Sequence, residues 1–579
     1  MFIPTTEKEI KELGWDRIDI VLVTGDAYID SPHIGVAVIG KILLQAGYKV
    51  GIIAQPDVLS GRDIKRLGEP GLFWGVTGGC IDSMVANYTA TGRKRRQDDY
   101  TPGGENNNRP DRAVIAYSNL IRKYFKATRP IVLGGIEASL RRIAHYDFWS
   151  DKIRRSVLFD AKGDYLAYGM AEQTVVEMAE CLKEKKHPGD IRGLCYISRE
   201  KPEACLELPS FQDTERDKQA FAEMFRLFYN NSDPSVASTL AQKQDTRYLV
   251  QNPPPPFLMD NKLDAVYNLK YERDLHPFYS KMGRVRALDT IRFSITTHQG
   301  CLGECNFCSI AVHQGRKVRR RSKNSILAEA REMAAHPLFK GNIQDVGGPT
   351  ANMYGMECSI KNKKAYCLKK RCLFPKICPD LKIDHGRQVA LLKELRSIKG
   401  IKKVFIASGI RHDLVLQDKK QGIKYMQQVI RHHVSGQLKI APEHSQANVL
   451  NCMGKPSSDS VLIFKDLFYR LTGQEKKKQF LTYYLIAAHP GCSRSDMAGL
   501  KSFCRHELGI IPEQIQVFIP IPSTYSALMY HTECNPFTGK PCFVEKNREK
   551  RAGQKDVLLA GAKKKLERGW VATRKSGVE

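Results

Sequence analysis

The sequence has no apolar run of the length that a transmembrane helix needs. The longest run, residues 480–488, is interrupted by Thr and Tyr and has the length of a strand. The first residues, from Met1 to Glu9, lack both the basic and the apolar stretch of a signal peptide. We therefore expect a cytoplasmic protein that has no membrane partner.

Acidic residues are scarce relative to basic ones. The 62 Asp and Glu residues stand against 91 Lys and Arg residues, which gives a formal net charge of +29. Such a charge favours anionic partners, and RNA is one candidate. Aromatic residues are not interleaved with basic clusters such as residues 316–321, and no C-terminal module is typical of RNA binding. A solvated basic surface is the simpler interpretation.

The first part of the chain alternates strand and helix signals. Residues 18–24 and 49–54 are apolar runs of strand length, and residues 34–46 between them carry helical spacing. This alternation predicts an α/β fold with a parallel, doubly wound, Rossmann-like sheet. We predict this N-terminal domain at residues 1–210, followed at residues 211–284 by a helical segment and a Pro-rich linker, Pro253 to Pro256.

Six strand–helix units follow the linker. They predict a (βα)6 partial TIM-type barrel at residues 285–530, with a Cys-rich insert at 355–380 and a basic C-terminal extension at 531–579. The loops after the strands should then form the active site. The predicted strands are 291–297, 343–347, 404–408, 437–441, 480–487 and 515–519.

Cysteine is plentiful, and its most informative group is Cys301, Cys305 and Cys308. The chain has 16 cysteines, and an intracellular chain of this size is not expected to carry a disulfide framework. The C-x3-C-x2-C triplet directly follows the first predicted barrel strand. Three thiolates can bind three irons of a 4Fe–4S cluster and leave the fourth iron open, which points to catalysis. A zinc site is the alternative for the triplet alone.

A C-x3-C-x2-C run in this position is the signature of radical S-adenosylmethionine (SAM) enzymes, and the sequence resembles that superfamily. Phe307, before the last cysteine, fits the same pattern. The resemblance implies that SAM chelates the open iron and that one-electron reduction cleaves it to a 5′-deoxyadenosyl radical. It also implies an electron donor, either a reductase or a flavodoxin-type protein.

Residues after the later strands complete the expected SAM site. Gly347 and Gly348 follow the second strand and resemble the pair that lets the backbone approach SAM, where a Cβ would clash. Arg411, after the third strand, is expected to pair with the SAM carboxylate as a planar fork. Glu443, after the fourth, is expected to face the ribose or the substrate. The alternatives are an ordinary turn for the glycine pair, a surface position for Arg411 and a packed turn for Glu443.

The resemblance narrows to the YgiQ-type radical SAM family. It rests on the N-terminal α/β domain, the run Asn252 to Pro255, the run Asp345 to Tyr354 and the Cys-rich insert. This family implies a cluster and SAM but no particular substrate. A protein of another class, a non-catalytic iron–sulfur protein that binds nucleic acid or senses redox state, remains the alternative, although a sensor would not need the glycine pair.

A second cysteine set, Cys358, Cys367, Cys372 and Cys378, lies in the insert. Four thiols in a short loop suit a closed zinc site or an auxiliary iron–sulfur cluster. The spacing lacks a C-x2-C pair, so free or packed thiols are an equal interpretation.

The N-terminal domain also raises the question of cobalamin. Radical SAM barrels are often preceded by a Rossmann-like B12-binding domain, whose base-off motif is Asp-x-His-x-x-Gly. Here the run is Asp30-x-x-His33-x-Gly35, so His33 is not placed as that ligand. We therefore do not expect cobalamin, and we expect the domain to serve as a platform for a substrate or partner.

Overall fold

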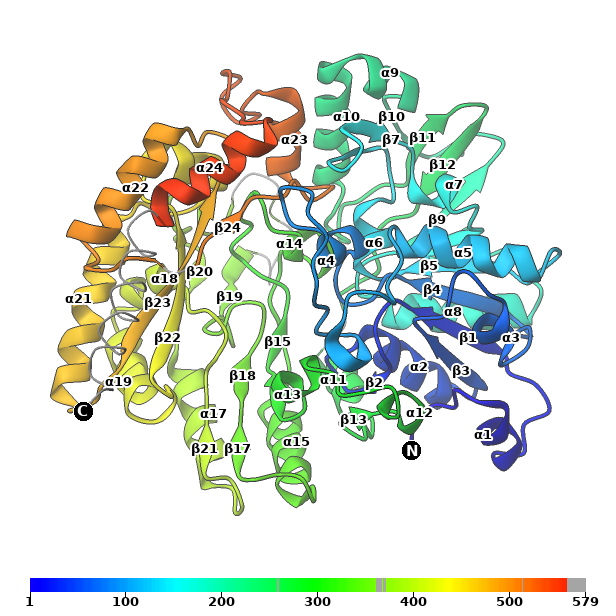
Figure 1. The fold of residues 1–579 in the computed structure, drawn as a ribbon, viewed down its shortest axis with the longest axis horizontal. Coiled ribbons are helices and arrows are strands. Elements are labelled where there is room, and N and C mark those ends of the chain that lie inside the picture. Colours follow the sequence, from blue (N-terminus) through cyan, green and yellow to red (C-terminus); the bar gives the residue numbers. More distant parts are fainter. Residues whose placement is uncertain (258–259, 361–366, 368–370, 513, 560–579) are drawn as a thin grey trace, which may run out of the picture.

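The computed structural model describes residues 1–257, 260–360, 367, 371–512 and 514–559. Two α/β units lie side by side (Figure 1): an N-terminal sheet with its helices, coloured blue through cyan to sea green, and a barrel, coloured bright green to red. None of the helices in these ranges is long and apolar enough to cross a membrane.

The N-terminal unit is built on a nine-stranded sheet. Five of its strands pair in parallel in the order β8-β5-β4-β1-β3, and the others extend it as β10-β11-β12-β9. The parallel strands are β1 (Ile20–Thr24), β3 (Val50–Ala54), β4 (Phe73–Thr77), β5 (Ile131–Gly134) and β8 (Tyr165–Ala167); the others are β9 (Leu194–Ser198), β10 (Leu206–Leu208), β11 (Leu240–Gln244) and β12 (Arg247–Gln251).

Strand β1 shows why this sheet is covered on both faces. All five of its residues are buried. Ile20 and Leu22 pack into the core under helices α2 (Gly35–Gln45) and α8 (Glu172–Lys183). Val21 and Val23 pack on the other face, under α5 (Ala113–Tyr124). A continuous apolar strand between two helical layers is the arrangement of a doubly wound parallel sheet, so the Rossmann-like prediction is confirmed.

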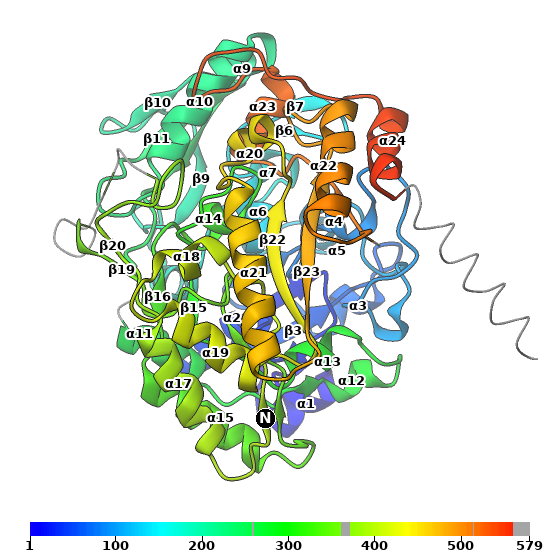
Figure 2. The ribbon, with the colours of Figure 1, turned by 90° about the vertical axis from the view of Figure 1, so that its left-hand side faces the viewer.

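The barrel follows the six-unit pattern. Its strands are β14 (Ser294–Thr296), β18 (Asp345–Gly347), β21 (Lys403–Val404), β22 (Gln437–Glu443), β23 (Phe480–Ala487) and β24 (Gln516–Val517). Figure 2 shows its helices on the outer face: α15 (Lys323–Ala335), α17 (Gly386–Ser397), α19 (Gly422–His432), α21 (Asp459–Gln474), α22 (Arg494–His506) and α24 (Arg548–Leu559).

Two expected boundaries differ from the observed elements. Strands β10 to β12 carry the N-terminal sheet to Gln251, beyond residue 210. Helix α24 packs on α22 as the sixth barrel helix, beyond residue 530. Residues 560–579 of the expected extension lie outside the described residues. The division of the chain into domains at 1–210, 211–284, 285–530 and 531–579 remains a prediction.

Candidate active site

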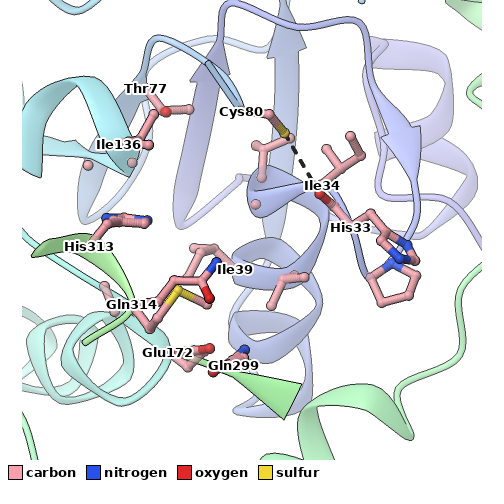
Figure 3. A pocket seen from close by; sticks show the side chains of 18 of the residues that line it. His33, Ile34, Ile39, Thr77, Cys80, Ile136, Glu172, Gln299, His313 and Gln314 are labelled. Carbon is pink, nitrogen blue, oxygen red and sulfur yellow. Dashed lines mark hydrogen bonds between the residues drawn. The ribbon is translucent and has the colours of Figure 1, made fainter. Parts of the chain in front are cut away.

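The carboxyl ends of strands from both units face one cavity of about 520 Å³. On the N-terminal side Thr24, Thr77 and Gly134 end β1, β4 and β5, and on the barrel side Thr296 and Gly347 end β14 and β18. Figure 3 shows side chains from both units around this space. Open α/β sheets and barrels bind ligands at these strand ends, so the cavity is the candidate active site.

The cysteine triplet lies in the loop after β15 (His298–Gln299). A Cβ built on Gly303 would lie 3.3 Å from the Cys301 sulfur and 3.7 Å from the Cys305 sulfur, so these two thiols face the same point. Burial, followed by the charges of Cys305 and Cys301, raises the pKa of the Cys308 thiol to about 12. The three thiols therefore share one environment, as the ligands of one cluster must.

Hydrogen-bond donors surround these sulfurs. The Gly303 N–H lies 3.3 Å from the Cys301 sulfur, and the Thr350 hydroxyl lies 3.5 Å from it. Arg411 Nη1 lies 3.7 Å from the Cys305 sulfur. Donors and a guanidinium favour the thiolate form that iron binds, so the residues present fit a 4Fe–4S cluster. No three His, Cys, Asp or Glu side chains among the described residues converge on a single ion, but a cluster takes each thiolate at a separate iron.

The glycine pair lies beside this loop. The Gly347 carbonyl accepts a hydrogen bond from the Thr297 N–H at 2.6 Å. A Cβ on Gly348 would lie 2.6 Å from the His298 ring. Glycine at position 348 is therefore required by a protein contact, in addition to the approach of SAM that we predicted. Both glycines line the cavity.

Arg411 lies at the cluster loop, but its fork faces Asp413. Its Nε donates to Asp413 Oδ1 at 2.9 Å and its Nη2 to Oδ2 at 2.5 Å. Burial disfavours charge on both side chains, yet their pairing holds the pKa of Arg411 above and that of Asp413 below the ordinary values. Its predicted pairing with the SAM carboxylate stays a prediction.

Glu443 ends β22 in a left-handed conformation, with φ of 69°. Its carboxylate is buried and lies 3.7 Å from Lys455 Nζ. Burial raises the pKa of the Glu443 carboxyl, and the Lys455 ammonium opposes that rise. Its charge helps to raise the pKa of Cys308, so it lies near the cluster loop, and it does not line the cavity. Its predicted contact with the ribose or the substrate stays a prediction.

The Cys-rich insert packs against the cluster loop. Cys372 and Cys378 join an apolar cluster that includes Leu302 and borders Cys301. Cys358 lies on β19 (Glu357–Cys358), and Cys367 is half-buried. Residues 361–366 and 368–370 of the insert lie outside the described residues, and a metal on the four cysteines stays a prediction.

Several polar residues on the cavity wall were not predicted as site residues. Glu172, His298 and His313 have polar atoms that are buried and have no hydrogen-bond partner among the described residues. His33 also lines the cavity, but its ring contacts Ser31 and, across to the barrel, Thr296 at 3.3 Å each. Glu172 follows an apolar strand end and begins a helix, and that position was the only signal of it in the sequence.

Comparisons with known proteins agree with this arrangement. The family model described as "Radical SAM N-terminal" matches residues 2–294. "UPF0313 protein FN0734" of Fusobacterium nucleatum is 54% identical over 558 residues, which cover 96% of this chain and 98% of that protein. A UPF0313 protein of Thermotoga maritima is 47% identical over 565 residues, with the same shares.

A solved structure shares the fold. It is the radical SAM methyltransferase TsrM from Kitasatospora setae with cobalamin and a 4Fe-4S cluster bound, at 13% identity, a TM-score of 0.51, and coverage of 89% of this chain and 78% of that one. Our expectation against cobalamin is therefore wrong, because a protein of this fold holds it. The Asp-x-His-x-x-Gly spacing tests only for a histidine ligand to cobalt, whereas a cavity at the sheet edge can hold a ligand by its walls.

Proposed function

This chain belongs to the UPF0313 family of radical SAM enzymes, and on that premise we propose that Cys301, Cys305 and Cys308 hold a 4Fe–4S cluster and that SAM binds beside Gly347 and Gly348. When bound, the two supply one-electron reductive cleavage of the SAM sulfonium. The observation that supports this proposal is the shared cavity, because the glycine pair faces it and the cluster loop follows directly from its wall.

The chain's own residues prepare this site in two ways. Gly303, Thr350 and Arg411 direct donors toward the cluster sulfurs, and Asp413 holds Arg411 in place. Apolar side chains from both units, such as Leu22, Val76 and Ile295, line the cavity and limit the access of water, which protects reactive species from side reactions.

The test is anaerobic reconstitution with iron and sulfide, followed by incubation with SAM and dithionite. We expect SAM cleavage, detected as 5′-deoxyadenosine, in the wild type and none in Cys305→Ala. Cys504→Ala is the matched control, because Cys504 is buried in α22 away from the cluster loop. A protein with a complete cluster that binds no SAM would contradict the proposal.

We further propose that the cavity takes a corrinoid. Its walls come from the edge of a Rossmann-like sheet and from the SAM-facing side of the barrel, and the TsrM structure with bound cobalamin has this fold. Equilibrium dialysis and visible absorbance with hydroxocobalamin test it. We expect saturable binding of one corrinoid per chain, and absence of binding by a protein that still binds SAM would refute it.

The net charge of the chain bears on its substrate and its electron donor. The net charge of +29 supports an anionic substrate such as RNA and an acidic donor such as a flavodoxin-type protein or a reductase. We also propose that the protein works in the cytoplasm. Binding to total RNA at several salt concentrations, followed by SAM-dependent modification of the bound RNA, tests the substrate. RNA binding without any SAM cleavage would favour the non-catalytic iron–sulfur protein instead.

A further inference from the structure

Glu172 is a buried acid on the cavity wall without a partner. The residue is 4% exposed, and neither carboxylate oxygen accepts a hydrogen bond in the part of the chain that the structure describes. It begins α8 and faces the cavity beside Gln299 (Figure 3).

The polar groups near Glu172 bond to one another and not to its carboxylate, and Arg319 Nε is left without a partner among the described residues. Arg319 Nη2 donates to the Gln299 carbonyl oxygen at 2.7 Å, and the Gln299 amide donates to the Tyr267 hydroxyl at 3.3 Å. The charge of Glu172 acts to raise the pKa of the nearby Arg319, but the two side chains form no ion pair. A buried carboxylate that lacks donors costs free energy, so its position calls for a donor from outside the chain.

Three other described residues of the wall have buried polar atoms without a hydrogen bond. Asp26 Oδ1 is one, but it forms an ion pair with Arg109 at 2.7 Å, and the other two residues are histidines. His298 Nε2 and His313 Nδ1 have no partner among the described residues. Burial lowers the pKa of each ring to about 4, so neither brings a positive charge to Glu172 near neutral pH. The remaining wall is largely apolar, with side chains such as Leu22, Ile39 and Val76. The cavity thus suits a ligand with apolar faces and a few N–H donors at its edge.

We propose that Glu172 is the residue that recognises the cavity ligand, by accepting hydrogen bonds from its amide N–H groups. A corrinoid has this chemistry, because an extended ring carries primary amides around its rim. The inference rests on the corrinoid part of the proposed function. It assigns to Glu172 a role in binding and none in holding the fold.

Stability separates these two roles. If Glu172 served the fold, its replacement by the neutral, isosteric Gln would lower the thermal midpoint of the ligand-free protein. As a binding residue that is unpaired without ligand, it lowers stability, so Glu172→Gln should leave the midpoint unchanged or raise it. The matched control is Glu180→Gln, which changes an exposed acid on the same helix.

The binding experiment uses hydroxocobalamin and a cobalamin monocarboxylic acid, in which one amide is replaced by a carboxylate. Affinities are measured by equilibrium dialysis. We expect Glu172→Gln to bind hydroxocobalamin about tenfold or more weakly than the wild type, because hydrogen bonds to a charged group are lost. The wild type should reject the acid whose carboxylate faces Glu172, and Glu172→Gln should discriminate less. Glu180→Gln should behave as the wild type.

The outcomes separate the two proposals. Wild-type protein that binds no hydroxocobalamin overturns both the corrinoid assignment and the role of Glu172. Wild-type binding that is unchanged in Glu172→Gln overturns the role of Glu172 alone. A lower thermal midpoint of the ligand-free variant, with unchanged affinity, would likewise show a structural residue.

Discussion

At the scale of single residues, Asp413 positions Arg411 beside the cluster loop. Both side chains are buried, and removal of the carboxylate would leave the guanidinium without a counter-charge. We expect Asp413→Asn to destabilise the ligand-free protein by about 3 kcal/mol, measured as a lower thermal midpoint. Asp466→Asn, which removes an exposed acid, should have little effect. An unchanged midpoint in Asp413→Asn would show that the pair does not stabilise the fold.

Gly348 gives a second prediction at this scale. An alanine methyl would lie 2.6 Å from the His298 ring, so the ring or the backbone of this cavity wall must shift. We expect Gly348→Ala to bind SAM at least about tenfold more weakly in equilibrium dialysis. Gly473→Ala is the control, because nothing lies within 4 Å of that methyl in helix α21. Equal SAM affinity in wild type and Gly348→Ala would mean that position 348 does not border SAM.

These residues also show how far the sequence predicts a site. Glycine at 347 and 348 could be placed at a strand end, because strand periodicity and turn residues are local signals. The contact of Gly348 with His298 could not be predicted from the sequence, because the ring comes from a neighbouring strand. Glu172 was missed for the same reason. Only the meeting of the two units makes its carboxylate part of a cavity wall.

At the scale of elements, helix α24 joins the two units through Arg551. Its fully buried guanidinium donates to the Ala90 carbonyl, at 3.2 Å, and to the Phe518 carbonyl. It also lies 4.7 Å from the centre of the Phe148 ring. A basic, polar segment predicts an exposed extension, because arginine is rarely buried without a carboxylate. In this protein, backbone carbonyls and an aromatic ring contact the Arg551 guanidinium where a carboxylate would be expected.

We expect Arg551→Lys to lower the thermal midpoint almost as much as Arg551→Ala, by several degrees. A lysine ammonium cannot donate along two fixed directions while stacking on an aromatic ring. Lys550→Ala, at an exposed neighbouring position, should match the wild type in differential scanning calorimetry. Full rescue by lysine would show that charge alone, and not the guanidinium plane, holds α24.

The strands differ in how well they could be predicted. Strand β23, Phe480–Ala487, was expected at 480–487, because buried and more exposed residues alternate along most of its length. Strand β11 was expected to be helical. Its buried residues include the polar Gln242 and Gln244, so the sequence lacks the alternation of apolar and polar residues that identifies a strand. Their side-chain oxygens accept hydrogen bonds from the Ala144 and Ser156 N–H groups, which only the folded structure supplies.

At the scale of the whole molecule, the active site depends on the docking of two units that could each be predicted alone. Strand β13 (Asp274–Leu275) pairs with β2 (Ile29–Asp30), and the Ser523 hydroxyl donates to the Leu140 carbonyl at 2.8 Å. These contacts join residues far apart in the sequence, so no local pattern predicts them. The cavity follows from this docking, because residues of both units line it.

Buried histidines throughout both units predict acid sensitivity. Burial lowers the pKa of seven of them to about 4: His33, His298, His313, His412, His433, His444 and His531. In the unfolded chain their pKa is 6.5. Between these values the unfolded state binds more protons, so stability is lost as the pH falls from 6.5 toward 4. Glu443, Asp30 and Glu137, whose pKa values burial raises, oppose this loss but are fewer.

We therefore expect the thermal midpoint of the ligand-free protein to fall by at least ~5 °C between pH 6.5 and about pH 5. His433→Asn should make the fall shallower, since it removes one titrating ring and keeps a donor for the Val404 carbonyl. His506→Gln, which changes an exposed histidine, should leave the size of the fall unchanged. A midpoint that stays level over this interval would contradict the prediction, because it would mean that these rings take up protons in the folded protein without loss of stability.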